Sequence, residues 1–142
     1  MRENRAFVFF RSKMPEQELS RTWEAEYQAH VLSELERLVT EYHDLRAFME
    51  DIGKRLVESA ILSHSVDLVE LGQEEEVLGI LGRLNPNAKD SERQGLVSLA
   101  KWSISLRTNA PEGFGDRDFE FAHKSLRNNF DRLYFRPVRN RG

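Results

Sequence analysis

An arginine, an aspartate and a histidine lie close together late in the sequence, as Arg117, Asp118 and His123. A histidine can take up or release a proton near neutral pH, which is the task of a general acid or base. An arginine can neutralise negative charge that develops on a reacting group, and Asp118 can steer Arg117. Arg117 and His123 are six residues apart, nearly two helical turns, so we expect both to face one cleft.

The pattern Arg-Asp-x4-His over residues 117–123 resembles the signature of the HEPN superfamily. The resemblance implies an all-α domain in which the motif lies near the start of a late helix and a dimer brings two copies together. It also implies that the domain cuts RNA without a metal. His123 would transfer a proton from the ribose 2′-hydroxyl or to the leaving oxygen, and Arg117 would stabilise charge on the phosphate.

Other groupings of reactive side chains predict no metal site and no cofactor site. Glu120 and His123 form a Glu-x-x-His pair, but a di-iron bundle needs a second such pair, and the sequence has none. His30 shares a helical face with Glu26 and Glu34, which we expect to be solvated because one face offers only part of a ligand set. The sequence contains no cysteine, so disulfides and thiolate ligands are excluded.

Basic residues gather at both ends of an otherwise acidic sequence. The formal net charge is −3, whereas residues 1–13 carry +3 and residues 117–142 carry +4, so the stretch between them is strongly acidic. Basic ends of this kind can contact an anionic partner such as nucleic acid, or they can simply be solvated.

The composition is that of one folded domain, residues 1–142. Hydrophobic residues make up 39% and charged residues 32%, which fits neither a disordered chain nor a membrane protein. No apolar run approaches the roughly 20 residues that cross a bilayer. The apolar stretch at 6–10, a strand or a helical segment, is too short for the core of a signal peptide. We therefore expect a cytoplasmic protein, to which the absence of cysteine is suited.

Apolar residues recur at helical spacing through the first half of the sequence. From residue 31 the spacing alternates between four and three, which is the heptad pattern of coiled coils. This seam consists of Val31, Leu35, Leu38, Tyr42, Leu45, Met49, Ile52 and Leu56. Leu32, Val39 and Phe48 widen the apolar stripe beyond a dimeric seam, which favours a helical bundle.

The seam leaves two questions open. Residues 15–63 form either one helix, about 70 Å long at ~1.5 Å per residue, or two helices. In the second case Asp44 caps a helix that begins at Leu45. Residues 31–56 can pack within their own chain, or they can bind a second copy or another protein.

Signals for the ends of helices divide the remainder of the sequence. Gly72 is expected to end a helix, because glycine readily adopts the left-handed conformation of a C-terminal cap. Ser91 and Gln94 have the spacing of a capping box, and Asp116 is expected to cap the last helix. Residues 136–142 are expected to form a basic, flexible tail.

These patterns predict an all-α helical bundle of about five helices, with one long N-terminal helix or a helical hairpin. The surplus of helix-packing positions favours a non-enzymatic protein–protein interaction module or a small assembly subunit. The alternative is a HEPN-like domain that binds or cleaves RNA without a metal, with Arg117, Asp118 and His123 as its catalytic residues.

Overall fold

The computed structural model describes residues 16–109, 112–113 and 115–137. These residues form the helices α2 (Glu16–Leu45), α3 (Asp51–Glu70), α4 (Glu74–Leu81), α5 (Asp90–Thr108) and α6 (Asp116–Phe130), with a 3-10 helix η1 (Arg46–Phe48) and a π-helix η2 (Asp131–Phe135). The described residues contain no strand, which confirms the predicted all-α bundle. The apolar stretch at 6–10 lies outside them.

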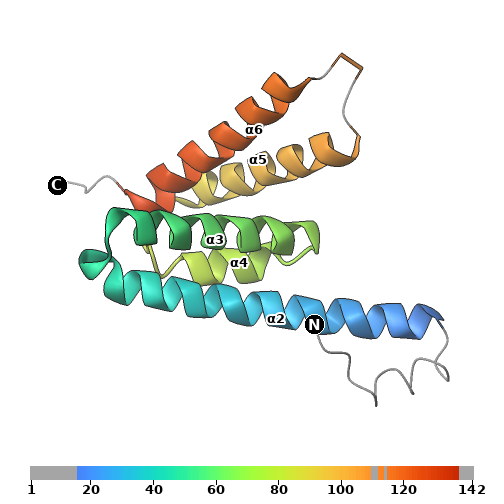
Figure 1. The fold of residues 1–142 in the computed structure, drawn as a ribbon, viewed down its shortest axis with the longest axis horizontal. Helices are drawn as coiled ribbons and strands as arrows, with labels where there is room; N and C mark the ends of the chain where they lie inside the picture. Colours follow the sequence, from blue (N-terminus) through green and yellow to red (C-terminus); the bar gives the residue numbers. More distant parts are fainter. Residues whose placement is uncertain (1–15, 110–111, 114, 138–142) are drawn as a thin grey trace.

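The N-terminal part of the bundle is a helical hairpin (Figure 1). α2 ends at Leu45, η1 follows, and Met49 and Glu50 have extended backbone conformations, with ψ angles of 141° and 155°. α3 then begins at Asp51 and runs back across α2. The structure therefore has two helices here, but Asp44 does not cap the second one, since it lies in the last turn of α2.

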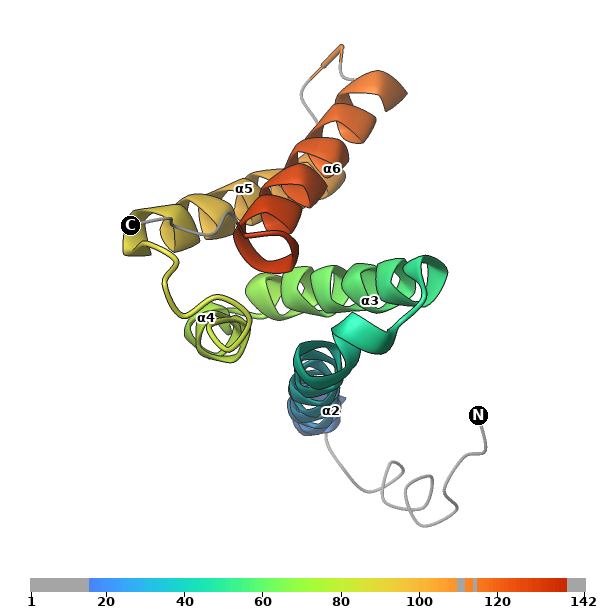
Figure 2. The ribbon, with the colours of Figure 1, turned by 90° about the vertical axis from the view of Figure 1, so that its left-hand side faces the viewer.

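α3 lies at the centre of the described structure (Figures 1 and 2). α2 packs against one side of it, and the pair α5 and α6 lies on the opposite side. α4 is a short helix beside α2 and α3. None of the helices that the structure describes is long and apolar enough to span a membrane.

Local hydrogen bonds explain where several helices begin and end. Gly72 has a φ of +80°, and the amide of Gln73 donates to the carbonyl of Leu68, which is the predicted glycine cap after α3. The predicted capping box at Ser91 is wrong, because α5 already begins at Asp90. Asp116 does not cap the last helix either, because extended backbone at Gly115 makes that residue the cap.

The end of α6 and the π-helix η2 close the core. Leu133, Tyr134 and Phe135 are all buried, and the ring of Phe135 packs edge-on against Tyr42 at a centroid distance of 5.4 Å. The ring of Tyr134 packs against Phe130 at 5.2 Å. The chain thus remains ordered in the core up to the residue at which the flexible tail was expected to begin.

A buried carboxylate ties this C-terminal segment to the hairpin. Glu58 of α3 is fully buried, and its side chain accepts hydrogen bonds from the Tyr42 hydroxyl and from Arg136, at 3.4 Å for the latter. Arg127 lies 3.8 Å from the same carboxylate, and Asp131 pairs with both arginines. We call these five residues the Glu58 cluster. Arg136 is therefore part of the folded body, while residues 138–142 of the predicted tail lie outside the described residues.

Candidate functional site

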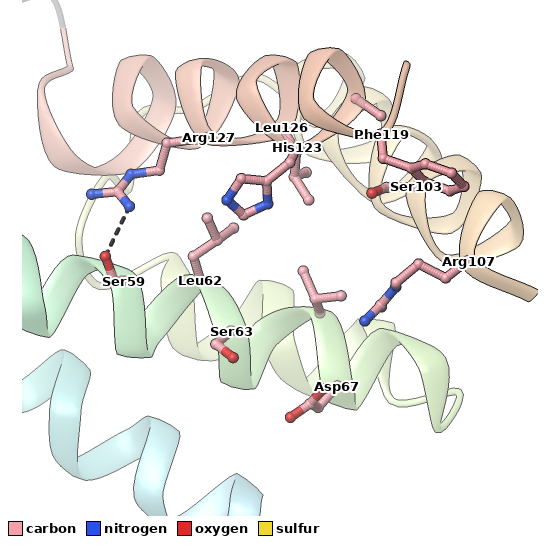
Figure 3. Close-up of a pocket in the computed structure, with 12 residues that line it drawn as sticks. Ser59, Leu62, Ser63, Asp67, Ser103, Arg107, Phe119, His123, Leu126 and Arg127 are labelled. Carbon is pink, nitrogen blue, oxygen red and sulfur yellow. Dashed lines mark hydrogen bonds between the residues drawn. The ribbon is translucent and has the colours of Figure 1, made fainter. Parts of the chain in front are cut away.

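A pocket of about 340 Å³ opens between α3, α5 and α6 (Figure 3). Its apolar lining comes from Leu62, Val66, Phe119, Ala122 and Leu126, and its polar lining from Ser59, Ser63, Asp67, Ser103, Arg107, His123 and Arg127. Pockets of this size and mixed lining are typical of small-molecule sites, where a few polar groups orient a ligand on an apolar surface.

His123 extends into this pocket between two arginines (Figure 3). Arg127 lies one turn further along α6, and its guanidinium donates a hydrogen bond of 2.8 Å to the Ser59 hydroxyl. Arg107 comes from α5, and its guanidinium lies 3.8 Å from the Glu70 carboxylate. Two guanidinium groups and an imidazole around an apolar surface suit an anion that also carries an apolar part.

The structure separates the three residues that the sequence placed together. His123 lines the pocket, whereas Arg117 and Asp118 are exposed in the first turn of α6 and do not line it. Six residues along an α-helix amount to about 120° around its axis, which puts Arg117 and His123 on different faces. Asp118 has a structural task, because its carboxylate accepts a 2.9 Å hydrogen bond from the Gly115 amide.

Sequence reasoning therefore found His123 but not the cations beside it. Arg127 follows His123 by four residues, so the ordinary rule for neighbours on a helix could have found it. Arg107 could not have been found in this way, because its position depends on how α5 packs against α6. No group of three or more potential metal ligands occurs among the residues that the structure describes.

A second candidate site is formed by exposed apolar side chains where the hairpin turns. Leu45, Phe48, Ile52 and Leu56 are 49%, 85%, 76% and 67% exposed, and we call these four residues the hairpin surface. Leu45, Ile52 and Leu56 belong to the predicted seam, whose earlier members Leu35, Leu38 and Tyr42 are buried. After the interruption at η1, Met49 still packs against the core, whereas Ile52 and Leu56 are exposed.

Comparisons with known proteins give one partial match. A stretch of 65 residues, 44% of this chain, is 35% identical to the probable mitochondrial threonine–tRNA ligase of Schizosaccharomyces pombe. The chain spans only 14% of the length of that relative, so the match does not show a family. No family model matches the sequence. No solved structure matches the fold.

Proposed function

We propose that this chain is a helical protein–protein interaction module that binds its partner through the hairpin surface. The observation that carries the proposal is the gathering of Leu45, Phe48, Ile52 and Leu56, all exposed, around a single turn. Isolated apolar side chains are common on protein surfaces, but a group of large ones is typical of an interaction site.

The bundle presents this surface on a firm support. Met49 lies within the turn and packs against the core, while Glu58, two residues after Leu56, is held by the Glu58 cluster. A surface fixed on helices loses little conformational freedom when it binds. Full burial of one Leu, Ile or Phe side chain contributes about 1.5–3 kcal/mol, so four such side chains are sufficient for the centre of an interface.

Affinity capture tests the proposal. A tagged wild-type chain should retain a protein partner, whether a different protein or untagged copies of the chain itself. The variant Phe48→Ser/Ile52→Ser/Leu56→Ser should lose it, because the apolar contacts are removed. The matched control is Trp102→Ser/Phe121→Ser, which changes two other exposed aromatic side chains and should retain the partner. If wild type retains nothing, or the triple variant retains the same partner, the proposal fails.

The second candidate function is an RNA-binding or RNA-cleaving domain of the HEPN type. His123 in a pocket with Arg107 and Arg127 favours it, because this set can transfer a proton and neutralise charge on a phosphate. The partial match to a protein that is named for tRNA is consistent with an RNA ligand. In this version Arg107 takes the role that the resemblance gives to Arg117.

Cleavage of single-stranded RNA in the presence of a chelator tests this second function. His123→Ala should abolish cleavage, because the proton-transfer group is lost. Arg107→Ala should slow it by on the order of 100-fold, as is typical when a group that stabilises developing negative charge is removed. Arg117→Ala should have little effect. If Arg117→Ala is inactive and Arg107→Ala is normal, the motif rather than the pocket carries the activity. If wild type leaves RNA intact and does not bind it, neither version stands.

A further inference from the structure

The pocket between α3, α5 and α6 lies where α6 separates from α3. The last turns of α6 lie close to α3, and its first turns lie far from it (Figures 1 and 2). Each helix lines the pocket with residues three or four positions apart, which share one side of a helix. These are positions 59, 62, 63, 66 and 67 on α3, 103 and 107 on α5, and 119, 122, 123, 126 and 127 on α6. The pocket is therefore bounded by three helix faces and not by a loop.

The two guanidinium groups of the pocket are engaged to different degrees. Arg127 donates a hydrogen bond of 2.8 Å to Ser59 and lies 3.8 Å from the buried Glu58. Arg107 lies 3.8 Å from Glu70, which is too long for a hydrogen bond, and it donates none to any residue that the structure describes. Arg127 therefore holds the fold together, whereas the planar donor fork of Arg107 is available to a ligand.

Two further polar groups of the pocket resemble Arg107 in this respect. Ser103 precedes Arg107 by about one turn of α5, and His123 lies opposite on α6. In Figure 3 the Ser103 hydroxyl and the His123 ring both point into the pocket. Neither side chain forms a hydrogen bond or an ion pair within the part of the chain that the structure describes. Three side chains that can donate hydrogen bonds thus meet in one pocket with their donors unused.

The apolar lining and the volume set the size of the molecule that fits. Leu62, Ala122 and Leu126 are buried, whereas Val66 and Phe119 are half-buried, so a ligand would remove further apolar surface from water. The volume of about 340 Å³ equals roughly eleven water molecules at about 30 Å³ each. A ligand of about a dozen non-hydrogen atoms fills such a space.

We infer that this pocket binds a small aliphatic monocarboxylate, with its head group at Arg107, Ser103 and His123 and its hydrocarbon chain against the apolar lining. A guanidinium matches a carboxylate with two parallel hydrogen bonds, which fixes the orientation of the head group. The hydroxyl and the imidazole add donors beside it. The pocket shares no residue with the hairpin surface, so the inference goes beyond the proposed function.

Acidic residues near Arg107 limit the charge of the head group. Glu70 pairs with Arg107, and Asp67 lines the same pocket, although its carboxylate points away from α6 in Figure 3. A monocarboxylate brings one negative charge, which Arg107 balances. A phosphate monoester or a strand of RNA brings more, and the two acidic side chains repel the excess. The charges therefore favour a small carboxylate over RNA as the occupant of this pocket.

Calorimetric titration with decanoate is the first test. Wild type should bind one decanoate at least tenfold more tightly than decan-1-ol, which has the same chain without the charge. Arg107→Gln should weaken decanoate binding about tenfold or more and leave decan-1-ol binding unchanged, because only the charged pair is lost. The control Arg117→Gln changes an exposed arginine outside the pocket and should bind as wild type does. From hexanoate to decanoate the affinity should rise about fourfold per methylene.

Chemical modification of histidines tests where decanoate binds. Diethyl pyrocarbonate modifies accessible imidazoles, and both His123 and His43 are exposed. Decanoate should slow modification of His123 several-fold, because the head group covers its ring. His43 lies near the end of α2, away from the pocket, and should be modified at an unchanged rate. Mass spectrometry of the peptides measures both rates.

Three results would overturn the inference: decanoate that binds no more tightly than decan-1-ol, unchanged decanoate binding in folded Arg107→Gln, or His123 modified equally fast with and without decanoate. If single-stranded RNA protects His123 and decanoate does not, the inference is likewise wrong and the pocket belongs to the second candidate function. None of these results bears on the hairpin surface, which the capture experiment tests separately.

Discussion

Leu56 and Glu58 lie two residues apart on α3, and their exposures are the reverse of what is usual for a leucine and a glutamate. Leu56 is 67% exposed, while Glu58 is 0% exposed. Burial of a carboxylate is unfavourable unless cations and hydrogen-bond donors compensate it, and Glu58 has Arg127, Arg136 and the Tyr42 hydroxyl. The bundle supplies partners for its buried charge but none for its exposed leucine. This difference indicates that the unusual features at Glu58 serve the fold, and it supports the proposal that those at the hairpin surface serve binding.

Removal of both arginines from the Glu58 cluster should have the largest effect on stability. Arg127→Ala/Arg136→Ala leaves the Glu58 carboxylate buried with no cation beside it, which typically costs about 3–5 kcal/mol. Urea denaturation followed by circular dichroism measures the free energy of unfolding. The control Arg117→Ala/Arg132→Ala also removes two arginines from the C-terminal part of the chain, and its loss should be much smaller. An equal loss in the control would show that Glu58 is not the reason.

Two buried tyrosines should respond differently to the same substitution. The Tyr42 hydroxyl donates a hydrogen bond to the charged Glu58, so Tyr42→Phe should lower the free energy of unfolding by about 1.5–3 kcal/mol. The Tyr134 hydroxyl is buried without a hydrogen-bond partner in the described structure, so Tyr134→Phe should be neutral or stabilising. Thermal and urea unfolding measure both variants. Destabilisation by Tyr134→Phe comparable to that by Tyr42→Phe would contradict the assigned roles.

The same tyrosines predict a loss of stability at high pH. Burial is the largest cause that raises the pKa of Tyr134 to about 12, and burial followed by the bond to Glu58 raises the pKa of Tyr42 as well. A raised pKa in the folded state means that folding disfavours the ionised form of the tyrosine relative to the neutral form. This contribution is complete below the unfolded pKa of about 10 and is lost as the pH rises above it. Unfolding between pH 9 and pH 12 should show a decline that is shallower in Tyr134→Phe.

The sequence predicted the class of fold and the buried half of the seam, because helical periodicity reports directly on burial. It offered a break at Asp44 as one of two alternatives, whereas the structure has the break at residues 46–50. Neither glycine nor proline occurs from Leu45 to Asp51, so no residue type in this stretch signals the extended conformation of Met49 and Glu50. The seam spacing continues across this break, so Ile52 was expected to pack against a helix, either of its own chain or of a partner.

The sites were predictable to a similar degree. His123 was recognisable from its residue type and from the helix on which it lies. The partners of Glu58 were not, because Arg127 and Arg136 come from much later in the chain and reach it only through tertiary packing. Arg136 was for that reason placed in a flexible tail, although it contacts the most deeply buried carboxylate in the described structure.

Substitutions on the hairpin surface should have the smallest effect on stability and a large effect on association. Phe48→Ser and Ile52→Ser change side chains that are 85% and 76% exposed, so the free energy of unfolding of the dilute monomer should change by less than about 0.5 kcal/mol. Leu35, a buried residue of the seam, gives the matched contrast. Leu35→Ala should lower the free energy of unfolding by about 2–5 kcal/mol. Urea denaturation of the dilute chain measures stability, and the capture experiment measures association. A loss of several kcal/mol in the dilute surface variants would mean that these side chains belong to the core after all, and the hairpin surface would no longer be a candidate for binding.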